Sequence, residues 1–183
     1  MRKLKTNELN RLSVEEFRSS VKVPAVIVLD NIRSQHNIGS VFRTADAFRI
    51  TSICLCGITS TPPHREIHRA ALGATESVDW KYYADTLSAL RELKNEGYVL
   101  VGVEQTEQSC ELQDFPFADT QKTAFIFGNE VNGIDDLILP EIDRFIEIPQ
   151  FGTKHSFNIS VTVGIVLWDY FIKTGFHRNH SEN

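Results

Sequence analysis

The sequence predicts an α/β fold with a mainly parallel β-sheet and flanking helices. Short apolar runs of strand length alternate along the chain with segments whose apolar residues recur at helical spacing. Such alternation is typical of parallel strands joined by helical crossovers. The chain has 183 residues, of which 42% are apolar and 23% are charged. This is a globular composition, and the length is sufficient for a buried core.

Five short apolar runs are predicted to be strands, and three segments are predicted to be helices. In the first of these helices, Ile38, Val41 and Ala45 recur at helical spacing. The expected strands are residues 25–30, 50–56, 98–104, 123–127 and 145–148. The expected helices are residues 37–49, 85–95 and 158–173.

We expect residues 24–176 to form the folded domain, residues 1–23 to form an extension with a short helix, and residues 177–183 to form a polar tail. No apolar run approaches the length of a membrane span, and no apolar signal core follows the basic residues at the start of the chain. We therefore expect a cytoplasmic protein that does not associate with a membrane.

Two pairs of residues, one of cysteines and one of histidines, have a spacing that could bind a metal, but neither pair has the further ligands that a metal site needs. Cys54 and Cys56 lie in an apolar run where alternate positions share a face, and no second cysteine pair completes a site. We expect reduced, mostly buried thiols there. His64 and His68 have i, i+4 spacing, but no third ligand is evident. No metal is therefore expected.

The formal net charge of −5 argues against general electrostatic adhesion to nucleic acid but leaves room for a local basic face. Basic residues gather in three clusters, and each is either solvated surface or a contact for an acidic partner. The clusters are Arg2, Lys3, Lys5 and Arg11; His64, Arg65, His68 and Arg69; and Lys173, His177, Arg178 and His180.

The first predicted helix carries an arginine on the side that faces away from its own core. At about 100° per residue, the apolar stripe leaves Gly39, Ser40, Arg43 and Asp46 on the opposite side. Arg43 is therefore either a solvated arginine or one that contacts a ligand. Gly39 lacks a Cβ, so a ligand or another backbone can approach closely there. Asn37, where the periodicity begins, is expected to cap the helix.

The loop Phe127-Gly-Asn-Glu-Val-Asn-Gly133 directly follows a predicted strand. Ligands of open α/β sheets bind beyond the carboxyl ends of strands, where this loop would lie. Gly128 would permit close backbone approach and Glu130 would supply a carboxylate; a tight turn with an exposed acid is the alternative. A helix is expected to start near Asp135. The chain has no G-x-G-x-x-G after the first strand and no Walker sequence, which disfavours dinucleotide and nucleoside triphosphate folds.

The stretch Ile148-Pro-Gln-Phe-Gly-Thr-Lys-His-Ser-Phe-Asn158 links a predicted strand to the last predicted helix. Ser156 or Asn158 could cap that helix, and capping alone would explain both residue types. A hydrolase that uses Ser156 and His155 ranks last among the alternatives. Adjacent residues rarely face each other, and no G-x-S-x-G elbow is present.

Residues 37–45, 127–133 and 148–158, in this order, resemble the signature of the SpoU (TrmH-type) branch of the SPOUT RNA methyltransferases. The match to Asn37-x-Gly-x-x-x-Arg43-Thr-Ala is complete, and Ser156-x-Asn158 matches with Phe157 where the family usually has Leu. The resemblance covers residues 24–175. It implies an α/β domain with a C-terminal deep trefoil knot, an exception among protein folds, and a homodimer with the site near the interface.

The resemblance further implies methyl transfer from S-adenosylmethionine to the ribose 2′-hydroxyl of RNA rather than DNA. On the compact size of the chain, tRNA is favoured over rRNA as the substrate. The implied catalytic residues are Arg43, Asn37, Glu130, Ser156 and Asn158. The implied cofactor-binding residues are Gly128, Ile148, Ser156 and Phe157. A catalytically inactive RNA-binding module with the same fold is the alternative.

Family proposals give Arg43 the task of activating the hydroxyl. A guanidinium is almost never deprotonated in proteins, so stabilising charge or positioning a phosphate is physically easier. Many larger relatives carry an extra N-terminal RNA-binding domain, and this chain is expected to find RNA with its own surface. Besides Arg43, the candidates for RNA contact are Arg65 and Arg69, in the loop of residues 62–69, and Arg178.

Overall fold

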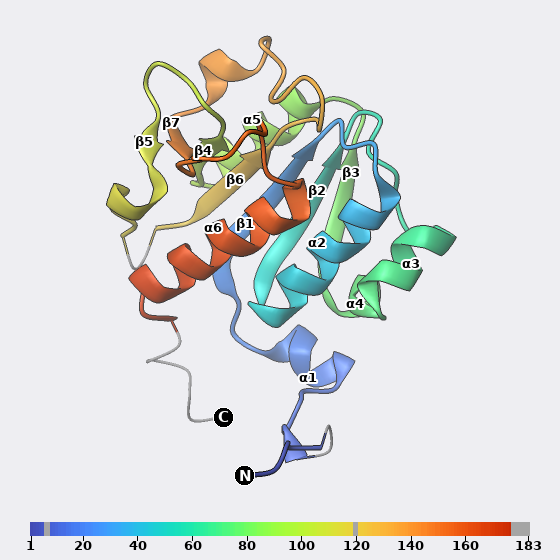
Figure 1. Ribbon diagram of the computed structural model, residues 1–183. Coiled ribbons are helices and arrows are strands. Elements are labelled where there is room, and N and C mark those ends of the chain that lie inside the picture. Colours follow the sequence, from blue (N-terminus) through green and yellow to red (C-terminus); the bar gives the residue numbers. More distant parts are fainter. Residues whose placement is uncertain (6–7, 119–120, 177–183) are drawn as a thin grey trace.

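A parallel β-sheet of seven strands forms the centre of the computed structural model, which describes residues 1–5, 8–118 and 121–176 (Figure 1). All six strand pairings are parallel. The order across the sheet is β3-β2-β1-β6-β4-β7-β5. The strands are β1 Val23–Asp30, β2 Ile50–Cys56, β3 Asp79–Tyr83, β4 Val99–Val103, β5 Cys110–Glu111, β6 Thr123–Phe127 and β7 Arg144–Glu147. The predicted fold class is confirmed.

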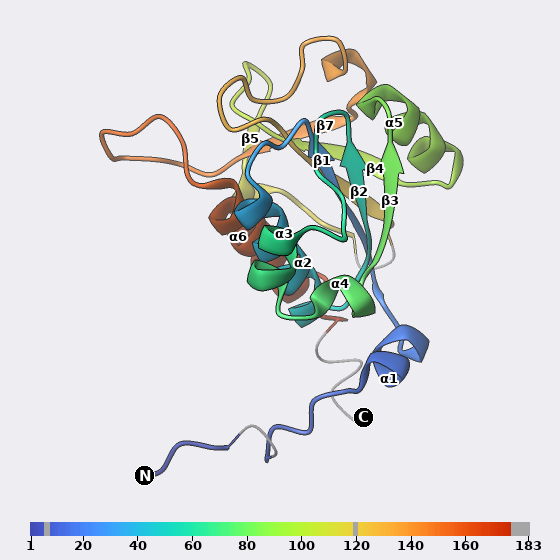
Figure 2. The same ribbon diagram turned by 90° about the vertical axis from the view of Figure 1, so that its right-hand side faces the viewer.

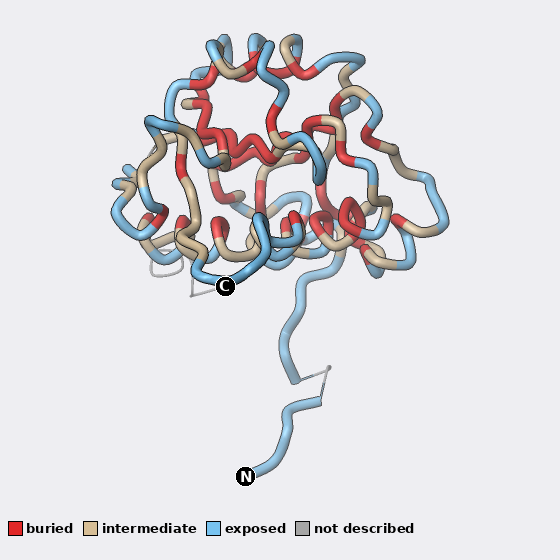
Figure 3. Tube along the Cα trace, turned by 45° about the horizontal axis from the view of Figure 1, so that its top comes forward, coloured by how far each residue is buried: buried red, intermediate tan, exposed pale blue. Residues whose placement is uncertain are grey.

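Helices cover both faces of the sheet (Figure 2). The helices are α1 Val14–Ser19, α2 Gln35–Ala47, α3 Arg65–Ala71, α4 Ala74–Ser77, α5 Thr86–Asn95 and α6 Ile159–Lys173, with 3₁₀ turns at Leu112–Asp114 and Leu139–Glu141. Successive side chains of a strand point to opposite faces. Accordingly, Ile27 of β1 lies in the core with α2 and α6, whereas Val28 lies in the core with α5. Figure 3 shows that the buried stretches of the chain lie toward the inside of the molecule and the exposed stretches around them.

The path of the chain after β6 crosses the line of β4 to form β7 and then returns to α6 on the face that α2 also covers (Figure 1). This path is consistent with the trefoil knot implied by the family resemblance; the knot itself stays a prediction. Within the described residues, no helix is long and apolar enough to cross a membrane.

Local signals set the helix boundaries, and one of them corrects a prediction. Ser34, not Asn37, caps α2: its hydroxyl accepts a hydrogen bond from the Asn37 backbone N–H at 3.2 Å. The helix therefore begins two residues earlier than predicted, and the Asn37 side chain is free for other partners. Of the two candidates for the cap of α6, Asn158 takes the role by accepting from the Ser160 N–H at 2.9 Å.

Four elements were not predicted: β3, β5, α3 and α4. β3 is a polar edge strand, and α3 and α4 are short, so their patterns are weak. The predicted loop of residues 62–69 is wrong in its second half, because α3 begins at Arg65. The helix expected near Asp135 is also wrong; a turn and the 3₁₀ segment Leu139–Glu141 occupy that region.

The two cysteines of β2 are buried free thiols, which confirms the burial prediction. They share a face and pack in the core beneath α5. Burial raises the pKa of the Cys54 thiol to about 12, so this thiol stays protonated and unreactive at neutral pH. His64 caps α3 by accepting from the Glu66 N–H at 3.3 Å. In the described part of the chain, no three potential ligands gather around a metal position.

Gly39 of α2 is buried against α3. A Cβ at this position would collide with the backbone carbonyl of Ile67 and would lie 2.7 Å from the Ala70 Cβ. Of the two expected approaches, ligand or backbone, the structure shows the backbone. Because Gly39 has no side chain, α2 and α3 can pack closely at this position.

We expect Gly39→Ala to lower the free energy of unfolding by about 1–3 kcal/mol, because a backbone carbonyl cannot move aside and the helices must separate. This loss is expected despite the higher helix propensity of alanine, worth up to about 1 kcal/mol. Urea unfolding measures it. Ser40→Ala adds no atom and is the neighbouring control, expected within about 0.5 kcal/mol of the parent. Equal stability of both variants would contradict this account of the α2–α3 contact.

Candidate functional site

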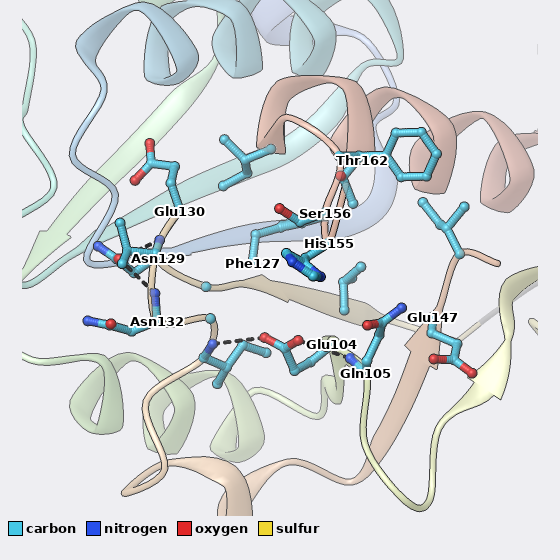
Figure 4. Close-up of a pocket in the computed structure, with 18 of the residues that line it drawn as sticks. Glu104, Gln105, Phe127, Asn129, Glu130, Asn132, Glu147, His155, Ser156 and Thr162 are labelled. Carbon is cyan, nitrogen blue, oxygen red and sulfur yellow. Dashed lines mark hydrogen bonds between the residues drawn. The ribbon is translucent and has the colours of Figure 1, made fainter. Parts of the chain in front are cut away.

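A pocket of about 710 Å³ lies at the carboxyl ends of β4, β6 and β7 and beside the start of α6 (Figure 4). This is the edge of the sheet where α/β proteins bind ligands. Its wall comes from three parts of the chain: residues 103–106 at the end of β4, residues between 127 and 139 after β6, and residues between 147 and 162 around β7 and α6. Pockets of this size hold nucleoside-sized ligands.

Three side chains join the three distant stretches by hydrogen bonds. The Asn37 amide donates to Glu130 Oε1 at 3.1 Å, and Asn37 Oδ1 accepts from the Asn158 amide at 3.1 Å. Asn37 is 7% exposed, so both of its polar atoms need such partners. The Asn158 Oδ1 in turn accepts from the Ser160 backbone N–H and hydroxyl. The Glu130–Asn37–Asn158 network therefore ties α2, the loop after β6 and the start of α6 together.

Glu130 is held in its charged form. Its carboxylate accepts from the backbone N–H groups of Arg33 at 3.0 Å and Ser34 at 3.1 Å, in addition to the Asn37 amide. Burial alone would raise the pKa of the Glu130 carboxyl, but these hydrogen bonds outweigh burial and hold the pKa below its ordinary value. The carboxylate thereby satisfies N–H groups at the entrance to α2.

The loop after β6 folds back on itself. Asn129 and Gly133 exchange two backbone hydrogen bonds of 2.9 Å. The Asn129 Oδ1 accepts from the N–H groups of Val131 and Asn132 at 2.9 and 3.2 Å, so the side chain mimics a turn. A Cβ on Gly128 would collide with the backbone of Gly133, which confirms that close backbone approach requires glycine there.

Glu104 is a pocket residue that sequence reasoning missed. Its carboxylate accepts from the Ile134 N–H at 3.0 Å and the Gln105 N–H at 3.0 Å (Figure 4). It also fills the space where a side chain on Gly133 would lie, and Gly133 has a left-handed φ of +72°. Glu104 directly follows β4, so the rule that ligands bind beyond the carboxyl ends of strands could have identified it.

The buried carboxylate of Asp30, 1% exposed, holds the same loop from below. It accepts from the Thr86 hydroxyl at 2.5 Å and from the Asp135 backbone N–H at 3.1 Å. The end of β1, the start of α5 and the end of the pocket loop are therefore connected. A buried carboxylate needs such partners, and here they restrain the loop that lines the pocket.

The structure gathers most, but not all, of the predicted site residues. The predicted residues that line the pocket are Gly128, Glu130, Ile148, Ser156, Phe157 and Asn158. Asn37 joins the site through the network described above. Arg43 does not line the pocket: it lies six residues after Asn37 on α2, about 9 Å along the helix axis.

Two of the predicted RNA contacts, Arg65 and Arg69, do not line the pocket. Arg65 and Arg69 lie on α3, and Arg65 is an exposed residue paired with Glu66 at 3.1 Å. Arg178 and the tail of residues 177–183 lie outside the described residues.

The pocket is acidic. The carboxylates along its wall belong to Glu104, Glu130, Asp136 and Glu147. Among the described residues that line it, none is a lysine or arginine, and His155 is the single histidine. Carboxylates without cationic partners attract a positively charged ligand and repel a phosphate. The site therefore suits a cationic molecule of nucleoside size.

Comparison with known proteins finds a family match over most of the chain. The sequence model of the SpoU rRNA Methylase family matches residues 24–168. The 23S rRNA (guanosine-2'-O-)-methyltransferase RlmB of Neisseria meningitidis serogroup B is 32% identical over 163 residues, covering 86% of this chain and 62% of that protein. The chain spans less than two thirds of the length of this and the next most similar curated relatives.

Solved structures share the fold. The A. aeolicus TrmH/SpoU tRNA modifying enzyme superposes with a TM-score of 0.79 at 23% identity, covering 92% of this chain and 84% of that one. An AdoMet-bound rRNA methyltransferase from Sinorhizobium meliloti superposes with a TM-score of 0.75 at 26% identity, covering 85% of this chain and 59% of that one.

The parallel sheet and the pocket at its carboxyl edge define an α/β protein whose ligand site is assembled from three separated stretches. All three stretches lie within the matched residues. The chain belongs to the SpoU rRNA Methylase family.

The lowered pKa of Glu130 predicts how pH affects stability. A carboxyl with a depressed folded-state pKa adds stability above the unfolded-state pKa of about 4.3, and this stability is lost as the pH falls through the folded-state pKa. We expect the parent to be more stable than Glu130→Gln at pH 7, by less than about 1 kcal/mol because water screens this exposed group. The difference is expected to shrink at acid pH.

Urea unfolding of both proteins between pH 3 and pH 7 measures this difference. The same substitution in an Asn37→Ala background is the control, because the hydrogen bond from Asn37 is already absent there. A smaller effect of Glu130→Gln in that background supports the coupling. If Glu130→Gln lowers the free energy of unfolding equally in both backgrounds, or equally at every pH, the Glu130–Asn37–Asn158 network is not the source of the stability difference.

Proposed function

We propose that this chain is an S-adenosylmethionine-dependent methyltransferase that acts on the ribose 2′-hydroxyl of a structured RNA, with residues 24–176 as the methyltransferase domain. The observation that carries the proposal is the Glu130–Asn37–Asn158 network beside an acidic pocket, in a member of this family. The N. meningitidis relative is named for guanosine 2'-O-methylation of 23S rRNA, which supports the reaction class.

The pocket residues fit S-adenosylmethionine. Its sulfonium and ammonium groups are cationic, and the pocket has carboxylates from Glu104 and Glu130 without a lysine or arginine among its described lining residues. Backbone groups of Gly128 and Ile148 would contact the cofactor, as would the side chain of Phe157, which is 42% exposed at the mouth. When bound, the cofactor supplies an electrophilic methyl group.

The remaining residues align the acceptor. An in-line displacement needs the hydroxyl held close to the methyl carbon and in line with the breaking bond, and much of the rate enhancement comes from that orientation. Ser156 and Asn158 stand at the pocket beside Glu130 and would position the ribose by hydrogen bonds. Arg43 would stabilise charge or hold a phosphate, since a guanidinium keeps its proton.

Arg43 reaches the reacting ribose only if a second copy of the chain contributes it, because in one copy it lies along α2 away from the pocket. We therefore propose a homodimer. Helix α6, which packs against α2, exposes Val161, Trp168 and Ile172 at 49%, 57% and 40%. Positions 161, 168 and 172 lie on one side of the helix, and an apolar face of this kind marks an interaction surface.

We favour tRNA over rRNA as the substrate because the described domain is small and tRNA is a compact substrate. In an assay with total RNA from cells that lack the protein, we expect it to transfer labelled methyl from S-adenosylmethionine to tRNA, and nuclease mapping to recover 2′-O-methylribose. Arg43→Ala is expected to lower kcat by about 10²–10³, a typical cost of losing a charge-stabilising donor.

Arg91→Ala, on α5 across the sheet, is the matched control and is expected to keep full activity. Label in ribosomal RNA alone would replace tRNA by rRNA as the substrate. The absence of both methyl transfer to RNA and S-adenosylmethionine binding would favour a catalytically inactive RNA-binding module, the alternative function.

We expect Trp168→Glu to shift the protein toward a monomer in light scattering after size exclusion, because a charge on an apolar interface is costly to desolvate. Leu137→Glu is the control, since Leu137 is 82% exposed away from α6. A parent protein that is monomeric at micromolar concentration would overturn the proposed dimer.

A further inference from the structure

We propose that a second pocket, at the other end of α2, binds a phosphate group of the RNA backbone through Arg11, Arg43 and Arg49. This inference rests on RNA being the substrate, as proposed above. The pocket has a volume of about 430 Å³. Its lining residues come from the N-terminal segment, α1, the end of α2 and the turn from α3 to α4. Figure 2 shows α1 close to α4.

The three arginines are available for a ligand. All three line this pocket, and none of their guanidinium groups makes a hydrogen bond or ion pair with a described residue. Of the two acidic residues in the wall, Asp46 already accepts from the Ser77 hydroxyl at 2.5 Å. The other is Glu76. Three cations against two carboxylates leave a net positive charge, and guanidinium groups match phosphate geometry with paired N–H donors.

Helix α1, which begins three residues after the exposed Arg11, packs against the domain. Phe17 is 5% exposed in the main core. Ser13 and Glu16 form a reciprocal capping box at the start of α1. Arg18 donates two hydrogen bonds, of 3.1 and 2.5 Å, to the Glu76 backbone carbonyl on α4. The part of the pocket wall that α1 supplies is therefore positioned by packing and hydrogen bonds.

Arg49 lies six residues after Arg43, outside α2. It adopts a left-handed backbone conformation, with φ of +51°, between α2 and β2. Glycine takes this conformation without steric cost, so an arginine here is held at a strained position. Its side chain lines the pocket with Arg43, the residue that the family motif shares. Arg11 precedes the residues that the family model matches, so the three-arginine site is not a property of the matched region alone.

The two pockets have opposite charge and lie toward opposite ends of α2. The acidic pocket lies beside the Glu130–Asn37–Asn158 network, and the arginine pocket is lined by Arg43. A cationic cofactor and an anionic RNA are thereby directed to different places on the same chain.

The test measures the affinity for unfractionated tRNA, by filter binding, as a function of salt concentration. The variants are Arg11→Gln with Arg49→Gln, and the control pair Arg91→Gln with Arg144→Gln, which removes equal charge from exposed positions outside both pockets. We expect the first pair to weaken tRNA binding by about tenfold or more and to make the log K against log[salt] slope about 1–2 less steep. The control pair is expected to change neither quantity by a comparable amount.

Thermal melting and S-adenosylmethionine affinity, measured on the same proteins, are expected to stay unchanged and thereby to exclude misfolding as the cause. Arg11→Lys with Arg49→Lys keeps the charge and is expected to keep the slope. The inference falls if the two glutamine pairs behave alike, or if the parent shows no salt-dependent tRNA binding. Methyl transfer to RNA is scored separately. Methyl transfer with equal tRNA binding by the two glutamine pairs would support the proposed function and overturn this inference. Weaker tRNA binding by the Arg11→Gln, Arg49→Gln pair without methyl transfer would support this inference and not the proposed function.

Discussion

The site depends on one buried amide. Asn37 is enclosed on α2 and bonds on one side to Glu130 and on the other to Asn158, which come from loops about a hundred residues later in the chain. Each loop is long and exposed, so it would lose considerable entropy on becoming ordered. Because both loops are bonded to the same rigid helix, their positions relative to each other are fixed, and this shapes the pocket between them.

The acidic wall of that pocket is compatible with the fold because hydrogen bonds engage two of its carboxylates. Glu130 accepts from backbone N–H groups at the start of α2, and Glu104 accepts from the backbone that follows Gly133. Both residues therefore have a structural role in addition to their charge. The same negative charge that repels RNA phosphates from this pocket favours a cationic cofactor.

Much of the fold was predictable because apolar periodicity reports the buried faces directly: β2 and β6 have the predicted bounds, and α5 and α6 differ from prediction by one residue at the start. Polar edge strands and short helices, such as β3 and α3, carry little apolar signal. The three motif stretches were predictable as one site, and Glu130, Ser156 and Asn158 do line the pocket. The position of Arg43 was not, because the rotation of a residue around a helix says nothing about its distance from a loop. The enclosure of Gly39 depends on α3, which was not predicted.

Helix α2 also fixes a geometric relation between the two pockets. Asn37 and Arg43 are six residues apart, so the helix sets both an axial spacing of about 9 Å and an angle of about 600°, equivalent to 240°. Side chains can be exchanged along this rod without altering either value. Inserting or deleting a single residue between them would turn one end by about 100° relative to the other. The number of residues between Asn37 and Arg43 therefore fixes both the distance and the rotation between the two pockets. Changing that number would disturb this relation more than changing most of the side chains in between.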